Sequence, residues 1–156
     1  MSSQPARKRR PRPRVAAVTA VGCLAVAAFQ MGLTLGAPLG AAALGGTISG
    51  PLPGSVRFVT AITALVWLFA TLVVLARGGF SLYPLPRAVT TRGTWVLVGL
   101  LGVATLLNFA SSSPWERYGW GPYSLTLMAL SILLARSRPP APQPRKTIGA
   151  HHVSSH

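Results

Sequence analysis

Charged residues are absent from long stretches of this chain and gather at the ends of those stretches. From Val15 to Val56 there is no charged residue, and only 10% of the 156 residues are charged. A soluble domain carries about 25% charged residues, because its surface must interact with water. Half of the residues here are hydrophobic. We therefore expect an all-α membrane protein, folded as a bundle of transmembrane helices.

Four apolar segments define the predicted bundle. About 20 residues at a rise of about 1.5 Å cross a hydrocarbon core of about 30 Å. The predicted spans of this four-transmembrane-helix bundle are about 15–35, 56–76, 94–110 and 118–135. The first apolar run continues well past Cys23, which favours a retained span over a cleaved signal peptide.

The basic residues predict how the spans are oriented. If the N-terminus is cytoplasmic, 13 of the 15 Lys and Arg residues fall on the cytoplasmic side, and only Arg57 and Arg117 fall on the outer side. Cytoplasmic loops of membrane proteins carry an excess of Lys and Arg. The pattern predicts a multi-pass protein of the inner (plasma) membrane with both termini cytoplasmic.

Residues 1–14 and 137–156 are rich in Pro and in basic residues. Such segments bury little apolar surface, so we expect both to be disordered. The net charge of +14 is a feature of nucleic-acid-binding proteins, but basic residues at the ends of spans favour an orienting role. Contact of the tails with anionic lipid is a further interpretation. All three histidines lie within 151–156, and no metal site is predicted.

Small residues recur every four positions late in the first predicted span, at Ala28, Gly32, Gly36 and Gly40. This spacing places them on one helical face, where another backbone can approach closely. The face serves either a homo-oligomer or other membrane-protein partner, or internal packing against a neighbouring span. The uncharged, Gly- and Pro-rich residues 36–54 are expected to form either a partly embedded cap or a short amphiphilic helix at the outer interface.

The second predicted span carries a polar stripe of Thr60, Thr63, Trp67 and Thr71. These positions share one face of a helix with 3.6 residues per turn. Hydroxyl groups gain nothing from facing lipid, so we expect the stripe to face the interior of the bundle.

The outer side collects polar side chains around Glu116, the only acidic residue in the chain. This cluster comprises Arg57, Asn108, Ser111, Ser113, Glu116 and Arg117. Because Arg57 opens the second predicted span and Glu116 precedes the fourth, an ion pair between them would join two helix ends. This clasp is our favoured interpretation, and a small polar ligand pocket at the outer leaflet is the alternative.

Catalytic chemistry is not predicted for this sequence. Acid–base catalysis by paired carboxylates is excluded because there is one carboxylate side chain, and no histidine lies within the predicted bundle. We therefore assign no catalytic, cofactor-binding or metal-binding residue and expect no cofactor. The spans also lack the acidic residues that proton-coupled pumps use.

Several short motifs occur together in this chain. They are Gly36-Ala-Pro38-x-Gly40, Gly45-Gly46, Leu52-Pro53 followed by Arg57, and Asn108-x-x-Ser111-x-Ser113-x-x-Glu116-Arg117 with Pro122. As a set they resemble a family of small, uncharacterised four-span bacterial integral membrane proteins. The resemblance covers about residues 15–136 and implies a four-helix bundle in the inner membrane. It implies no activity, because the family has none assigned.

The sequence therefore predicts a non-enzymatic integral membrane protein with a structural or accessory role. The alternative is a small-molecule permease or ligand-binding membrane component that acts as an oligomer, since one four-helix bundle has little room for a water-filled path. The lipid bilayer is the expected partner, and nucleic acid is not expected.

Overall fold

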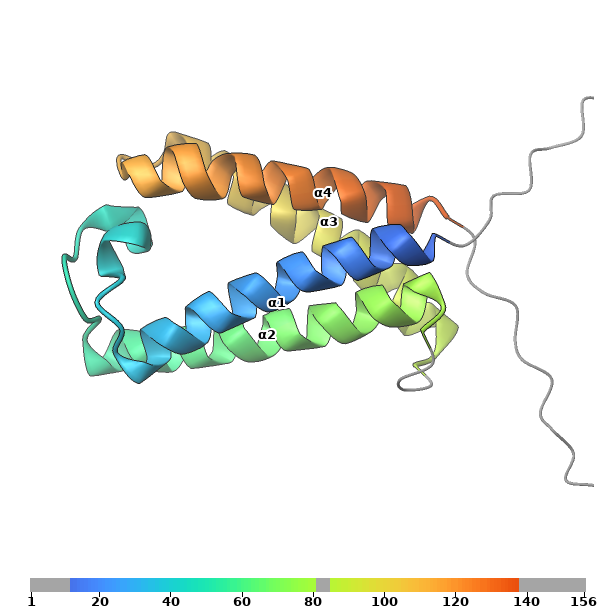
Figure 1. Cartoon of the computed structure of the whole chain (residues 1–156), viewed down its shortest axis with the longest axis horizontal. Coiled ribbons are helices and arrows are strands. Elements are labelled where there is room, and N and C mark those ends of the chain that lie inside the picture. The colour runs from blue at the N-terminus through green and yellow to red at the C-terminus, as the bar shows by residue number, and fades with distance from the viewer. Residues whose placement is uncertain (1–11, 81–84, 138–156) are drawn as a thin grey trace, which may run out of the picture.

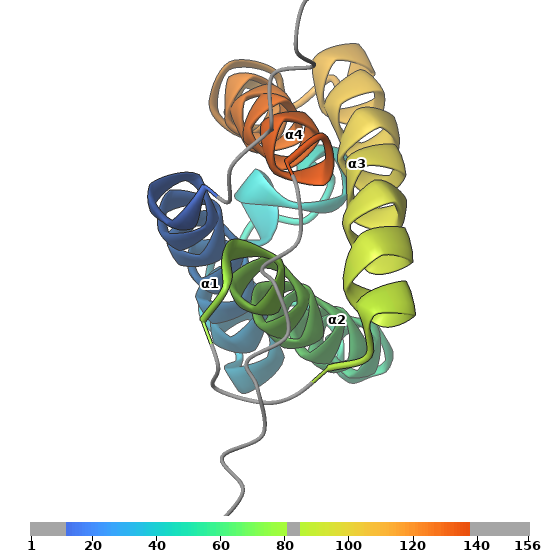
Figure 2. The same ribbon diagram turned by 90° about the vertical axis from the view of Figure 1, so that its right-hand side faces the viewer.

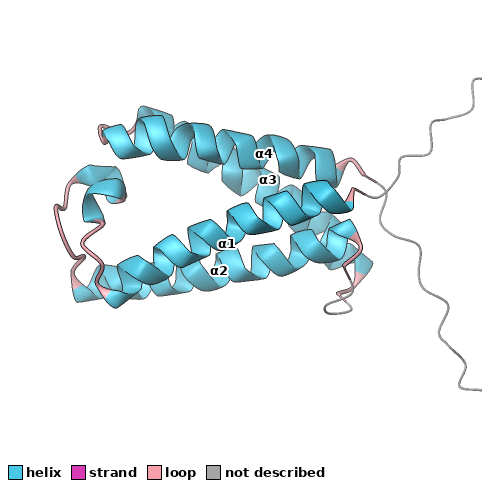
Figure 3. Ribbon diagram, viewed as in Figure 1, coloured by secondary structure: helices cyan, strands magenta, loops and turns pink. Residues whose placement is uncertain are grey.

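The computed structural model describes residues 12–80 and 85–137, and all regular secondary structure in this part of the chain is helical (Figure 1 and Figure 3). The α-helices are α1 (Pro13–Leu35), α2 (Gly54–Gly78), α3 (Arg87–Ala110) and α4 (Gly121–Ala135). Two short 3-10 helices, η1 (Gly40–Ala42) and η2 (Leu44–Gly46), lie between α1 and α2. A π-helix, η3 (Trp115–Trp120), leads into α4.

Helix boundaries follow from the residues at the ends. Pro13 lies in the first turn of α1. Proline has no backbone N–H, but the N–H groups of the first turn have no acceptor within the helix, so no hydrogen bond is lost. Gly36 ends α1 with a left-handed backbone (φ 93°), and Gly79 ends α2 in the same way (φ 96°). Glycine adopts this conformation without steric cost. The predicted tails lie almost entirely within residues 1–11 and 138–156, outside the described residues.

The predicted spans coincide with the four α-helices, but the third begins earlier than expected. Helix α3 starts at Arg87 rather than near 94, directly after Pro86. Arg87 and Arg92 are exposed in its first turns. Arginines near a helix end can extend their charged groups to the membrane surface. Because the third span was predicted from its apolar run alone, the predicted helix was too short at its N-terminal end.

Three of the described helices, α1, α2 and α3, are long and apolar enough to cross a membrane. Helix α4 has 15 residues by itself, but η3 precedes it directly and makes residues 115–135 one helical segment. Many large apolar side chains face outward: Phe58, Val96 and Leu106 are 69%, 60% and 72% exposed. Apolar outer faces on helices of this length define a multi-pass helical membrane protein.

The helices pair into two hairpins, α1 with α2 and α3 with α4 (Figure 1). The hairpins lie close together at the end where α1 begins and α4 ends, and they diverge toward the other end. There the segment between α1 and α2, residues 37–53, folds over the gap between them; Figure 2 shows it between the two hairpins. We call residues 37–53 the cap.

Small residues allow the close approach at the narrow end. A Cβ atom added to Gly78 would collide with Ala16 on α1, which is fully buried. Farther along α1, a Cβ atom on Gly22 would collide with Leu127 of α4. The hydroxyl of Tyr123 donates a hydrogen bond to the Gly22 carbonyl oxygen at 2.8 Å. Backbone proximity through small residues, with an added interhelical hydrogen bond, is a common way to join membrane helices.

Candidate ligand-binding cavity

Hydrogen bonds fasten the cap to the α3–α4 hairpin. The Gly45 N–H donates to Glu116 Oε1 at 3.0 Å, and the Trp120 indole N–H donates to the Ala42 carbonyl oxygen at 3.0 Å. The buried Ser113 hydroxyl donates to the Ala41 carbonyl oxygen, also at 3.0 Å. These bonds satisfy polar cap groups that would otherwise be costly in a membrane. The cap thus bridges the two hairpins.

The expected clasp between Arg57 and Glu116 is not formed. Arg57 Nε donates instead to the Leu52 carbonyl oxygen at 2.8 Å, inside its own hairpin. The Glu116 carboxylate accepts from Gly45, and no described residue forms an ion pair with it. Both residues lie at the cap end of the molecule, but each makes its hydrogen bond with a backbone group of the cap, Arg57 with Leu52 and Glu116 with Gly45.

The predicted face of small residues also needs correction. Ala28 and Gly32 lie within α1, but Gly36 is the residue that caps the helix and Gly40 begins η1. A Cβ atom on Gly36 would lie 2.9 Å from Arg57 Nη2, and one on Gly40 would lie 2.5 Å from a cap carbonyl oxygen. The left-handed turn at Gly36 ends the helical face. The last two glycines make room for Arg57 and for the cap.

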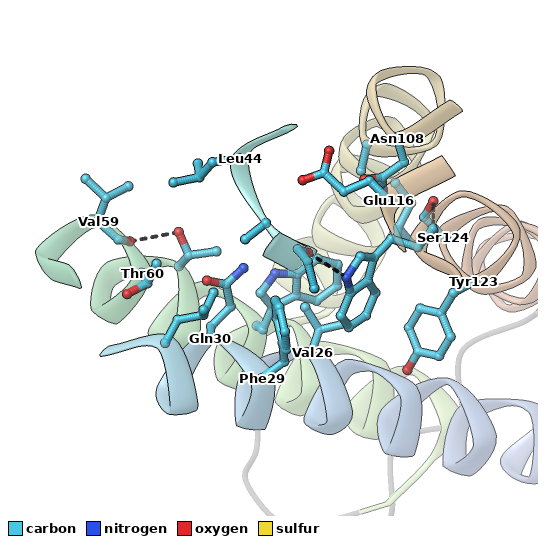
Figure 4. Close-up of a pocket in the computed structure, with 18 of the residues that line it drawn as sticks. Val26, Phe29, Gln30, Leu44, Val59, Thr60, Asn108, Glu116, Tyr123 and Ser124 are labelled. Atoms are coloured by element: carbon cyan, nitrogen blue, oxygen red, sulfur yellow. Dashed lines mark hydrogen bonds between the residues drawn. The ribbon is translucent and has the colours of Figure 1, made fainter. Parts of the chain in front are cut away.

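A cavity of about 300 Å³ lies beneath the cap, between the diverging hairpins (Figure 4). Its walls are mainly apolar, and all four α-helices contribute to them. Aromatic side chains form part of this wall: Phe29, Trp67, Trp120 and Tyr123. Trp120 lies between two of them, with ring centroids 4.7 Å from Phe29 and 5.5 Å from Tyr123.

Six polar side chains also line the cavity, and they fall into two groups. Thr60, Thr63 and Ser124 donate their hydroxyl hydrogens to backbone carbonyl oxygens of their own helices. Their hydrogen-bonding capacity is therefore largely used within the fold.

The second group consists of Gln30, Asn108 and Glu116. No described residue makes a hydrogen bond to the side-chain amide of Gln30 or of Asn108, or to Glu116 Oε2. In Figure 4, Gln30 rises from α1 while Asn108 and Glu116 come from the opposite hairpin. All three residues are partly exposed, so these groups remain open to hydrogen bonds from a molecule that enters the cavity. The cavity therefore presents unused polar groups from three elements to whatever enters it.

The other members of the predicted polar cluster serve the backbone. Ser111 Oγ accepts a hydrogen bond from the Ser113 N–H at 3.1 Å and shapes the turn after α3. Arg117 is exposed and does not line the cavity. Of the six predicted residues, Asn108 and Glu116 reach the cavity, and Ser113 holds the cap above it.

The polar stripe on α2 faces the interior, as expected. Thr60 and Thr71 are buried, and Thr63 and Trp67 line the cavity with Thr60. The Thr60 hydroxyl also shares a hydrogen bond of 2.9 Å with Thr34, which ties α1 to α2.

Sequence reasoning missed Gln30 and Arg77. Gln30 is a lone amide within the apolar first span, and that isolation was the available signal, since unpaired polar groups are costly in membranes. Arg77 was counted only as a charge at the exit of the second span. It is 3% exposed and donates hydrogen bonds to backbone carbonyl oxygens at the end of α4.

Within residues 12–80 and 85–137, no three His, Cys, Asp or Glu residues are grouped so that they could hold a metal ion. The tail histidines lie outside these residues. Comparisons of the chain with protein-family models, with curated proteins and with solved structures find no match.

Proposed function

We propose that this protein is a non-enzymatic component of the plasma membrane that binds a small amphiphilic molecule between its two helical hairpins. The observation that supports this most directly is the cavity of about 300 Å³. Its wall is largely apolar, and Gln30, Asn108 and Glu116 contribute polar groups, the two amides and Oε2, to which no described residue makes a hydrogen bond. Small-molecule sites combine an apolar wall with a few polar groups that orient the ligand.

A second part of the proposal is the topology of four spans with both termini cytoplasmic. Residues 115–135 form a continuous helical segment, and 21 residues extend about 30 Å at the rise of a helix. The arginines at the narrow end of the bundle and in the tails outnumber those at the cap end, Arg57 and Arg117. An excess of basic residues on the cytoplasmic side favours this orientation. The resemblance to small four-span bacterial membrane proteins is consistent with it.

Cysteine accessibility in intact cells tests the topology. Cys23 is fully buried, so the natural chain serves as the background for single added cysteines. We expect a membrane-impermeant maleimide to label Ser49→Cys at an exposed position of the cap, and to leave Ser3→Cys and Ser155→Cys unlabelled until the cells are permeabilised. If Ser155→Cys is labelled from outside while Ser3→Cys is protected, the chain has three spans and the four-span proposal is wrong.

Ligand binding can be tested with 4-bromobenzyl alcohol, whose bromine quenches tryptophan fluorescence on contact. Trp67 and Trp120 line the cavity. In nonionic detergent we expect a saturable component of quenching above the linear component that comes from partition into the micelle. Ala104→Leu adds bulk to the cavity wall on α3 and should abolish the saturable component.

The matched control for the filled cavity is Ala129→Leu. Ala129 lies on α4, is exposed and does not line the cavity. This variant should retain the saturable quenching of the natural protein. Linear quenching that is the same in all three proteins would show that the cavity binds no such molecule, and would leave a purely structural or accessory role.

Two further proposals concern the partners of this protein, namely other copies of the chain and anionic lipid. Transport of the bound molecule would require association of several copies, because a capped cavity in one bundle is not a path across the bilayer. Contact of the basic tails with anionic lipid would strengthen the cytoplasmic orientation by about 1 kcal/mol per basic residue near the surface.

A further inference from the structure

The chemistry of the cavity also points to the class of its ligand, if the proposed binding function holds. Glu116 is the only charged residue among those that line the cavity. No described residue supplies it with a counter-ion, because Arg57 binds the Leu52 carbonyl oxygen and Arg117 does not line the cavity. Glu116 is partly exposed, and a carboxylate without a counter-ion attracts a cation that enters the cavity. We propose that the cavity binds a small organic ammonium ion with an apolar body.

The cavity offers hydrogen-bond acceptors of the kind that an ammonium ion needs. Glu116 Oε1 already accepts from the Gly45 N–H, whereas no hydrogen bond from the described residues reaches Oε2. Gln30 and Asn108 each add an amide oxygen that accepts hydrogen bonds. A primary ammonium group has three N–H donors and no acceptor. Glu116 and Asn108 offer such acceptors on one side of the cavity, and Gln30 offers another on the opposite side (Figure 4).

The aromatic wall supports the same ligand class. Phe29, Trp67, Trp120 and Tyr123 contribute to the lining, and Trp120 packs against both Phe29 and Tyr123. Cations are attracted to the faces of aromatic rings, most strongly to that of Trp. An aromatic wall beside a lone carboxylate is a combination that binds organic cations better than neutral molecules of the same shape.

Size and charge exclude other ligand classes. A volume of about 300 Å³ is at the lower limit of small-molecule sites, so it suits a single ring or short chain rather than a two-chain lipid. An anion would meet the Glu116 carboxylate without any basic residue in the cavity wall. A neutral alcohol would fill the apolar space but would leave the carboxylate without a counter-charge.

The test compares two probes that differ in one group, 4-bromobenzylammonium and 4-bromobenzyl alcohol, at neutral pH in nonionic detergent. Saturable tryptophan quenching gives Kd for each. We expect the ammonium probe to bind at least about tenfold more tightly than the alcohol, as one charge pair with cation–π contacts would produce. In Glu116→Gln the preference should disappear, with less than about a threefold change in Kd for the alcohol.

Glu116→Gln is suited to this purpose because the Gln amide oxygen can still accept the Gly45 N–H that Glu116 Oε1 accepts at 3.0 Å. The cap should therefore stay in place. Arg117→Gln is the matched charge control: it alters a neighbouring exposed residue that does not line the cavity, and should leave the preference for the ammonium probe unchanged.

The possible failures are distinguishable. The cation assignment is wrong if both probes bind with equal Kd, or if Glu116→Gln keeps the preference for the ammonium probe. If Ala104→Leu abolishes binding in either of these cases, the cavity remains a binding site. If neither probe gives saturable quenching in the natural protein, the proposed function and this inference both fail.

Discussion

Replacement of Arg77 by Met should open the narrow end of the bundle. Arg77 is in the last turn of α2, and its Nη2 donates to the carbonyl oxygens of Ala135 at 2.8 Å and Ser137 at 2.7 Å. Nη1 donates to Thr91 Oγ1 at 3.0 Å, which adds a contact to α3. The last carbonyl groups of a helix have no partners in the helix, and they form the negative end of its dipole. Arg77 therefore joins three helices at one point.

The expected loss of stability can be worked out from these bonds. A hydrogen bond from a charged donor contributes about 1.5–3 kcal/mol net, so the two short bonds from Nη2 are worth at least about 3 kcal/mol. The Nη1 bond to Thr91 adds up to about 1 kcal/mol, while the contact of Nε with Leu134 at 3.4 Å is too long to count. We expect Arg77→Met to lower the free energy of unfolding by about 3–4 kcal/mol. Arg77→Lys keeps a charge near the helix end and should lose about half of that.

Equilibrium unfolding in mixed micelles of increasing denaturing-detergent fraction measures the loss, with Arg92→Met as the control. Arg92 is an exposed arginine in the first part of α3, so its replacement should cost less than about 0.5 kcal/mol. Hydrogen exchange in residues 130–137 should also accelerate in Arg77→Met alone. If Arg77→Met unfolds like Arg92→Met and exchange at the end of α4 is unchanged, the joining role assigned to Arg77 is wrong.

Three further predictions concern the cap end of the molecule. Gly40→Ala should destabilise the protein by about 2 kcal/mol, because its Cβ would lie 2.5 Å from a cap carbonyl oxygen; Gly99→Ala, with nothing within 4 Å, should be neutral or stabilising in the same unfolding assay. Trp120→Phe removes the indole N–H bond to the cap and should cost about 1 kcal/mol, with faster exchange of cap amides by mass spectrometry. Exchanging the charges, with Arg57→Glu and Glu116→Arg, should give a coupling energy below about 0.5 kcal/mol in a double-mutant cycle, since the two side chains bind different backbone groups. A coupling energy above about 1 kcal/mol would show that Arg57 and Glu116 do interact, as the clasp interpretation requires.

The elements of the fold were largely predictable because the rules behind them are local. In hydrocarbon every backbone N–H and C=O must find its partner within the segment or its immediate neighbours, so a long apolar run has to be helical. The predicted spans accordingly coincide with α1 to α4, with the largest error at the start of α3, where Arg87 and Arg92 extend from its first turns. The interior-facing stripe with Thr60 and Trp67 followed from helical periodicity in the same way.

The candidate site was predicted only in part. Asn108 and Glu116 stood out as polar residues at the end of a span and as the lone acid, and both line the cavity. Gln30 comes from a distant part of the chain, and its place opposite them depends on how the hairpins diverge (Figure 4). The cavity itself was not predictable, since no pattern along one helix specifies the space left between two hairpins.

By itself, the sequence determined that the chain is apolar and helical, where its helices run, and which end of each carries charge. Those properties depend on composition, on periodicity and on caps such as Gly36, all of which act over a few residues. Only the tertiary structure decided the partners of the few polar side chains: Glu116 with Gly45, Arg57 with Leu52, and Arg77 with the end of α4. The physical reason is that a charged or amide group in an apolar interior binds whichever backbone group packing brings within about 3 Å, and that choice depends on how segments far apart in the chain meet.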